Sequence, residues 1–160
     1  MAAIKNRQGL RMRTWALLLA SLAMVCVLGL QGAHALEEDP IRVGATASLT
    51  GRFAALGTQQ LEGLQMWVHD INARGALLGR KVKLVHYDDK SDPDTSAQLY
   101  ERLIKDDQVD LLIGPYSSDL TLAASGVAER HNFPMVAAGA PSSAIWSQGY
   151  RNVFGIDAPA

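Results

Sequence analysis

Short apolar runs alternate with longer amphipathic stretches from residue 41 onward, and this alternation restricts the fold more than any other feature of the sequence. Five runs have the length and character of buried strands: Ile41–Ala47, Val82–His86, Val109–Ile113, Met135–Ala138 and Asn152–Ile156. Strands separated by helical patterns at this spacing form βαβ units with parallel strands and right-handed crossovers. The sequence therefore predicts an α/β fold with a mostly parallel sheet and helices on both faces.

Three helices are predicted between these strands. The first begins near Thr58 and presents an apolar face whose members lie three or four positions apart: Leu61, Leu64, Trp67, Val68 and Ile71. The second is capped by Asp94 or Thr95, and the third runs from about Ser118 to Arg130. Each predicted helix is long enough to cover one face of a sheet.

The first 35 residues have the organisation of a secretory leader. Four basic residues precede an apolar run, Trp15–Leu30, which is followed by the small-residue segment Ala33–Ala35. This arrangement is typical of a signal peptide cleaved after Ala35. The apolar run is shorter than the roughly 20 residues of a membrane span, and the two large residues before Cys26 fit poorly with lipid anchoring at that cysteine. We predict a signal peptide over residues 1–35 and a periplasmic mature chain over residues 36–160.

The predicted mature chain is acidic and has no cysteine. It carries eleven of the fifteen Lys and Arg residues and all sixteen Asp and Glu residues, which gives a formal charge of −5. Such a surface argues against a nucleic-acid partner. The single cysteine, Cys26, would leave with the leader, and export without a disulfide favours a bacterial periplasm.

The stretch 110–120 indicates where a ligand would bind. Gly114-Pro115 ends a short apolar strand, and Tyr116, Ser117 and Ser118 follow, with Ser118 at the expected N-cap of the third helix. In a parallel sheet the loops after the strands meet at one edge, where helix N-termini offer N–H groups to anions. Glycine, hydroxyl and aromatic residues gather in four such loops: Ser48–Gly57, Tyr87–Pro93, Tyr116–Ser118 and Gly139–Ser143.

The sequence does not favour an enzyme, a cofactor or a metal site. Residues 50–57 approach the nucleotide-binding turn of short-chain dehydrogenases, but Ala55 stands where its middle glycine is needed. Neither a P-loop nor a Gly-x-Ser-x-Gly elbow occurs, and the histidines lack metal-ligand spacing. Asp88 and Asp89 suggest a phosphoacceptor or Mg²⁺ pair, but Thr46–Ser48 stands where the acidic partners would be required. We therefore expect a solvated acidic loop there.

Several motifs in order resemble type I periplasmic binding proteins, in the branch that binds leucine, isoleucine and valine for ABC transporters. The matching segments are Ile41–Gly44, Ser48–Gly51, Asp70–Gly75, Leu78–Val82, Tyr87–Asp89 with Asp92-Pro93, and Ile113–Pro115. The resemblance spans about Ile41 to Ile156. It implies a flavodoxin-like lobe that binds an amino acid or similar small carboxylate between two lobes and delivers it to a membrane permease.

The resemblance also implies a set of ligand-binding residues. A serine after the third strand and hydroxyl and backbone groups after the fourth would hold the carboxylate, and aromatic residues would contact the ligand body. The positions that match are Ser118, with Ser117 as the shifted alternative, Tyr116, Gly139, Ala140, Ser142 and Phe53. Pro141 stands where a hydroxyl residue is common, and Asp119 would repel a carboxylate unless it turns toward solvent.

Residues 36–160 correspond to the N-terminal lobe alone. We therefore expect a truncated chain without the second lobe and with weak ligand affinity of its own. A ligand-sensing receptor module of the same fold is the alternative function.

Overall fold

The computed structural model describes residues 39–156, so the predicted signal peptide lies outside the described residues. The order of elements is β1 (Ile41–Ala47), α2 (Ala54–Ala73), β2 (Val82–Asp88), α3 (Pro93–Lys105), β3 (Leu111–Ile113), α4 (Ser118–Arg130), β4 (Met135–Ala137), α5 (Ser143–Trp146) and β5 (Val153–Gly155). Across residues 39–156, no helix is both long and apolar enough to cross a membrane.

The five strands form one parallel sheet in the order β2-β1-β3-β4-β5. The chain adds β2 on one side of β1 and then continues on the other side with β3, so the direction of winding reverses between β1 and β3. In open α/β sheets the crevice outside the carboxyl ends of the strands at such a reversal is the usual ligand site. The predicted fold class is confirmed.

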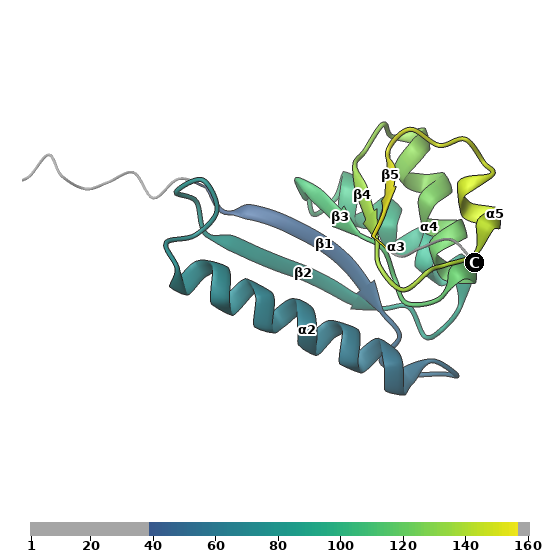
Figure 1. Ribbon diagram of the computed structural model, residues 1–160, viewed down its shortest axis with the longest axis horizontal. Coiled ribbons are helices and arrows are strands. Elements are labelled where there is room, and N and C mark those ends of the chain that lie inside the picture. The colour runs from purple at the N-terminus through teal and green to yellow at the C-terminus, as the bar shows by residue number, and fades with distance from the viewer. Residues whose placement is uncertain (1–38, 157–160) are drawn as a thin grey trace, which may run out of the picture. The chain divides into compact units, whose positions relative to one another are not determined.

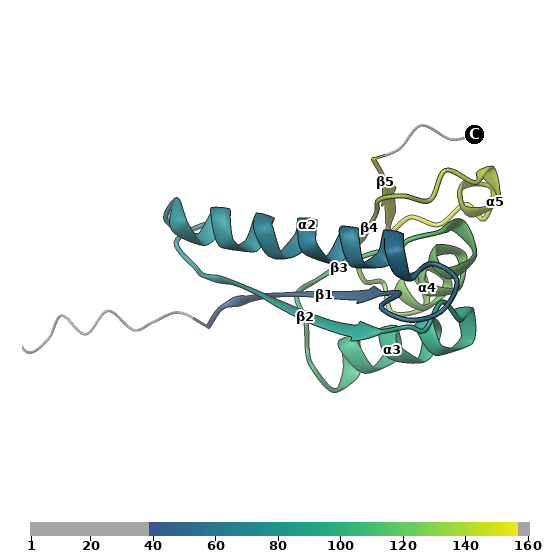
Figure 2. The same ribbon diagram turned by 90° about the horizontal axis from the view of Figure 1, so that it is seen from below.

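Helices cover both faces of the sheet, as predicted. Figure 2 shows α2 on one side of β1 and β2 and α3 on the other. This follows from right-handed crossovers, because the connection from β1 to β2 runs in the opposite direction to those from β2 to β3 and from β3 to β4.

The two faces differ in how much apolar surface they bury. On the side of α3 and α4, a large core includes Tyr100, Leu103, Leu112 and Met135, which are fully buried. On the side of α2, the core is small: Ile41, Val43 and Val82, with partly buried side chains around them. Of the predicted apolar face of α2, Leu61 is buried but Trp67 is 40% exposed.

Some element boundaries differ from the predictions. Helix α2 begins at Ala54 instead of Thr58, because its first turn lies in a segment whose glycine and hydroxyl content resembles a loop. Helix α3 is capped by Asp92, whose carboxylate accepts a hydrogen bond from Thr95 N–H at 2.7 Å, and Pro93 is its first residue. Helix α5, four residues long, was not predicted from the sequence.

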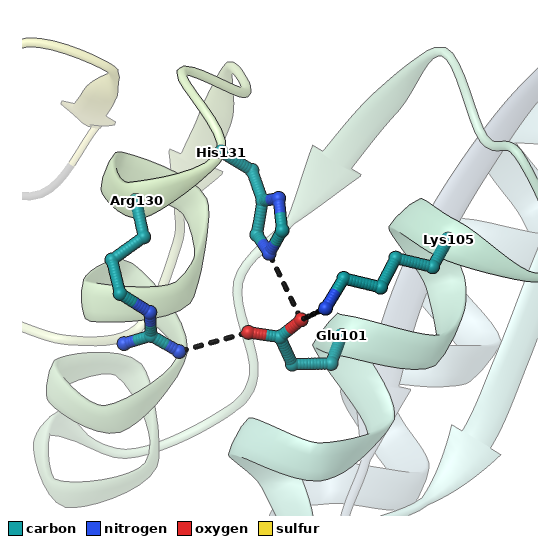
Figure 3. A network of polar contacts seen from close by, with 4 residues as sticks. All are labelled: Glu101, Lys105, Arg130 and His131. Atoms are coloured by element: carbon teal, nitrogen blue, oxygen red, sulfur yellow. Dashed lines mark hydrogen bonds and ion pairs between the residues drawn. The ribbon is translucent and has the colours of Figure 1, made fainter.

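An ion cluster joins α3 to the end of α4 (Figure 3). Glu101 of α3 lies 2.7 Å from Lys105 Nζ, 2.9 Å from an Arg130 guanidinium nitrogen and 2.9 Å from His131 Nε2. Although burial acts in the opposite direction, these basic groups lower the pKa of the Glu101 carboxyl to about 2, with the hydrogen bond from Lys105 as the largest cause.

Candidate functional site

The loops that follow the strands contain the candidate site, and because the sheet is parallel they all lie at its carboxyl edge. Two aromatic rings meet at the reversal between β1 and β3. Phe53, after β1, and Tyr116, after β3, have ring centroids 5.7 Å apart at 72°, an edge-to-face contact. The structure therefore brings together two of the predicted residues.

Ser117 is the N-cap residue of α4, which corrects the prediction that Ser118 is the cap. Its backbone has φ 85° and ψ 148°, a conformation that is strained for any residue with a Cβ. Hydrogen bonds on both sides hold it there: Ser117 N–H donates to Gly139 O at 3.3 Å, and its carbonyl accepts from Thr121 N–H at 3.0 Å. Strained residues held in this way concentrate at functional sites.

The hydroxyl of Ser117 does not cap the helix. Its Oγ atom is buried and has no hydrogen-bond partner within residues 39–156. A buried hydroxyl without a partner costs about 1–3 kcal/mol of unfolding free energy, so each such group calls for an explanation. Here the atom lies beside the first turn of α4, where N–H groups have no partner within the helix.

Ser118 and Ser142 already have hydrogen-bond partners in the protein. Ser118 Oγ accepts from Ser142 N–H at 3.2 Å, which ties the loop after β4 to the start of α4. Ser142 Oγ caps the short helix α5 by accepting from Ala144 N–H at 3.3 Å. Both serines fix the shape of the edge, whereas the hydroxyl of Ser117 has no hydrogen-bond partner in the described residues.

Gly139 and Ala140 lie directly opposite in the loop after β4. Gly139 has φ 89°, a left-handed conformation that favours glycine, and a Cβ built on it would contact the ring of Tyr116 at 3.4 Å. Ala140 is buried. The predicted residues of the third and fourth loops are thus neighbours in space.

The sequence suggested that Asp119 would repel an anionic ligand unless its side chain turned toward solvent, and in the structure it does so. Its carboxylate forms an ion pair with Arg52 at 3.1 Å, and both side chains are largely exposed. The Arg52 guanidinium carbon also lies 4.4 Å from the centroid of the Phe53 ring. Asp119 therefore points outward and is neutralised at the rim.

Gln60 of α2 was missed from the sequence. Its side-chain nitrogen donates to Gly114 O at 3.0 Å, at the end of β3, and lies 3.5 Å from Ala138 O, after β4. Its Oε1 atom, like Ser117 Oγ, is buried without a partner in the described part of the chain. The available signal was a polar residue at helical spacing from Leu64 on the apolar face.

Asp89 is fully buried, so the expectation of a solvated acidic loop was wrong. Its carboxylate accepts hydrogen bonds from the hydroxyls of Thr46 at 2.8 Å and Ser48 at 2.6 Å and from Ser91 N–H at 2.9 Å. These neutral donors take the place of water around the carboxyl group. Elsewhere in residues 39–156, no group of three His, Cys, Asp or Glu side chains is placed to hold a metal ion.

A comparison with known protein families assigns this chain to a family. The periplasmic binding protein family matches residues 40–159. The chain belongs to this family. The Leu/Ile/Val-binding protein of Escherichia coli K12 is 32% identical to this periplasmic binding protein over 117 residues, which are 73% of this chain and 31% of that protein. The chain spans about a third of the length of the curated relatives that it matches.

Solved structures agree with this assignment. The branched-chain amino acid transporter substrate binding protein LivJ from Streptococcus pneumoniae, in complex with isoleucine, has a TM-score of 0.72 and 27% identity, covering 76% of this chain and 34% of its own. A solute-binding protein of an ABC transporter from R. palustris, in complex with benzoate, has a TM-score of 0.67 and 28% identity, covering 75% and 33%. These relatives are solute-binding proteins.

Proposed function

We propose that residues 39–156 form one wall of a binding cleft for a small carboxylate, an amino acid or an aromatic acid, and that the protein is a binding component of an ABC importer and not an enzyme. The observation that carries this proposal is the Ser117 hydroxyl. It is buried without a hydrogen-bond partner in residues 39–156, it lies on a strained backbone, and it stands at the N-terminus of α4, where the direction of winding reverses between β1 and β3.

A carboxylate is the ligand group that suits these surroundings. The first turn of a helix offers N–H donors and a positive dipole end, and the Ser117 hydroxyl adds a donor, so no lysine is needed. Isoleucine and benzoate, the ligands of the two solved relatives, differ in their bodies but share a carboxylate. The same group would serve as the common handle here.

The aromatic pair would contact the ligand body. Phe53 and Tyr116 stand beside the proposed carboxylate position and present ring surface at the same edge. We assign Ser117, Tyr116, Gly139, Ala140 and Phe53 to the ligand, with Ser118 and Ser142 supporting the loops that present them.

A second lobe would supply the opposite wall. A single sheet edge covers one side of a ligand, whereas good sites bury roughly 70–90% of the ligand surface, and hinge closure of two lobes provides that burial. Export through the predicted signal peptide and delivery to a membrane permease complete the proposed role.

Two-dimensional ¹H–¹⁵N NMR titration of the full chain tests the proposal, because it detects weak binding and locates it. Benzoate and L-leucine are the probes, and benzamide and L-leucinamide are matched controls without the carboxylate. We expect shifts at the amides of residues 116–121 and 139–142 with either acid and none with the amides. Equal shifts with acids and amides, or shifts spread away from this edge, would refute the carboxylate role.

A further inference from the structure

The acidic pair that ends β2 fastens the loop between β1 and α2. Asp88 Oδ1 accepts from Leu49 N–H at 2.9 Å, Thr50 N–H at 3.3 Å and Lys90 N–H at 2.8 Å, and Oδ2 accepts from the Thr50 hydroxyl at 2.8 Å. A single carboxylate thus gathers donors from two loops. The bond from Leu49 N–H is partly buried, and those from Thr50 and Lys90 are exposed.

The charged form of Asp88 is the one that these donors stabilise. Burial raises the pKa of the Asp88 carboxyl, but the hydrogen bonds from Lys90 N–H, from the Thr50 hydroxyl and from the N–H groups of Leu49 and Thr50 together lower it below its ordinary value. Asp88 therefore stays a full acceptor at neutral pH.

Asp89 and Ser91 extend the same attachment to Phe53. Asp89 holds the Ser91 N–H at 2.9 Å, and the Ser91 hydroxyl donates to Thr50 O at 2.8 Å and accepts from Phe53 N–H at 3.0 Å. The two loops also touch closely at Gly51, where a Cβ would come 2.5 Å from Lys90 O. Phe53 is therefore held from the β2 side, and its ring meets Tyr116 on the β3 side.

We propose that Asp88 and Asp89 are positioning residues for the solute site, acting through Ser91 and the 48–53 loop to hold Phe53 against Tyr116. This inference rests on the proposed carboxylate-binding function and adds to it: the acids never touch the solute, yet they set the wall that its body meets. A preorganised wall avoids the cost of ordering the loop when the ligand binds.

The test compares Asp88→Ala and Ser91→Ala with Asp92→Ala in the full chain. Asp92 lies in the same loop but caps α3 through Thr95 N–H, so its loss affects stability without reaching Phe53. We expect the dissociation constant for benzoate, measured by NMR titration, to rise about tenfold in Asp88→Ala and Ser91→Ala and to stay within about twofold in Asp92→Ala. Amide hydrogen exchange at Leu49, Thr50 and Phe53 should accelerate in the first two variants only.

A double-mutant cycle separates positioning from a general loss of stability. If Asp88 acts through Phe53, then Asp88→Ala adds little further loss of benzoate affinity in a Phe53→Ala background, because interacting residues are not additive. Full additivity would overturn the proposal, as would unchanged benzoate affinity in both Asp88→Ala and Ser91→Ala. If the wild-type chain binds benzoate no better than benzamide, the proposed function fails and this inference fails with it; binding that the variants retain would overturn the inference alone.

Discussion

The two halves of the carboxyl edge use polar groups in opposite ways. In the half that follows β1 and β2, the carboxylates of Asp88 and Asp89 are surrounded by hydroxyl and N–H donors. Beside the loops that follow β3 and β4, Ser117 Oγ is buried without a partner in the described chain, and so is Oε1 of Gln60, a residue of α2 whose amide nitrogen reaches Gly114 O. The two carboxylates have their hydrogen bonds satisfied within the protein, whereas these two oxygens do not.

Under the proposed function, this difference separates a supporting region from a binding region. Groups that are satisfied internally contribute to stability and shape, while buried groups that are not satisfied cost stability and remain able to form a hydrogen bond with a ligand. Substitutions of the two carboxylates should therefore lower stability more than substitution of Ser117 does, and substitution of Ser117 should mainly lower ligand affinity.

Asp89→Ala should show the largest effect on stability. It leaves the buried hydroxyls of Thr46 and Ser48 without their acceptor, and we expect the free energy of unfolding to fall by about 3 kcal/mol, measured by urea denaturation. A loss below about 1 kcal/mol would mean that the supporting half is not fixed by this carboxylate.

Glu101 provides a reference carboxylate that lies outside the proposed site, and the test substitution is Glu101→Gln. Because the folded-state pKa of Glu101, about 2, lies below its ordinary value of 4.5, its contribution is present above pH 4.5 and is lost as pH falls toward 2. Its side chain is 28% exposed and two of its partners are largely exposed, so we expect a loss of about 1–2 kcal/mol at pH 7.

The pH dependence of that loss provides the check. Urea denaturation from pH 7 to pH 3 should show the difference between wild type and Glu101→Gln shrinking below pH 4.5, while Glu62→Gln, on the exposed surface of α2, serves as the control. Benzoate affinity should be unaffected, because the cluster lies between α3 and α4. A difference that grows at low pH would contradict the assignment.

Ser118→Ala should have an intermediate effect. It removes the acceptor of Ser142 N–H, so we expect a stability loss of about 1 kcal/mol and faster hydrogen exchange at that amide. The loss comes from the tie between two loops and not from capping α4, since Ser117 occupies the cap position. Unchanged exchange at Ser142 would show that the tie is not formed in solution.

Ser117→Ala should cause the smallest loss of stability. Because its buried hydroxyl has no partner in the described chain, removing it relieves an unsatisfied group, and the free energy of unfolding should stay equal or rise by up to about 1–3 kcal/mol. Thermal unfolding of Ser117→Ala beside Ser118→Ala gives the direct comparison, and a larger loss in Ser117→Ala would reverse the roles assigned to the two serines.

The sequence predicted the fold better than the details of the edge. Alternating strands and helices determine a parallel sheet, and α4 spans Ser118 to Arg130 as predicted, although its N-cap residue is Ser117 and not Ser118. Helix α5 is too short for periodicity to detect. The burial of Asp89 depends on hydroxyls more than 40 positions away in the sequence, so a local pattern assigned it to solvent.

The sequence could not show that Ser117, and not Ser118, occupies the cap position of α4, and the reason is again that the cause is not local in sequence. Adjacent serines look equivalent in sequence, and only the positive φ of Ser117 and the bond from Ser142 N–H to Ser118 Oγ distinguish them. Resemblance to known proteins indicated this loop and favoured Ser118, with Ser117 as the shifted alternative.

The affinity of Ser117→Ala for benzoate is the most direct test of the division of the edge. With a melting temperature no lower than that of wild type, we predict a dissociation constant at least about tenfold higher, as expected for the loss of a hydrogen bond to a charged group. An affinity equal to that of wild type in a variant that is at least as stable would contradict the account, because the Ser117 hydroxyl would then have no role in binding.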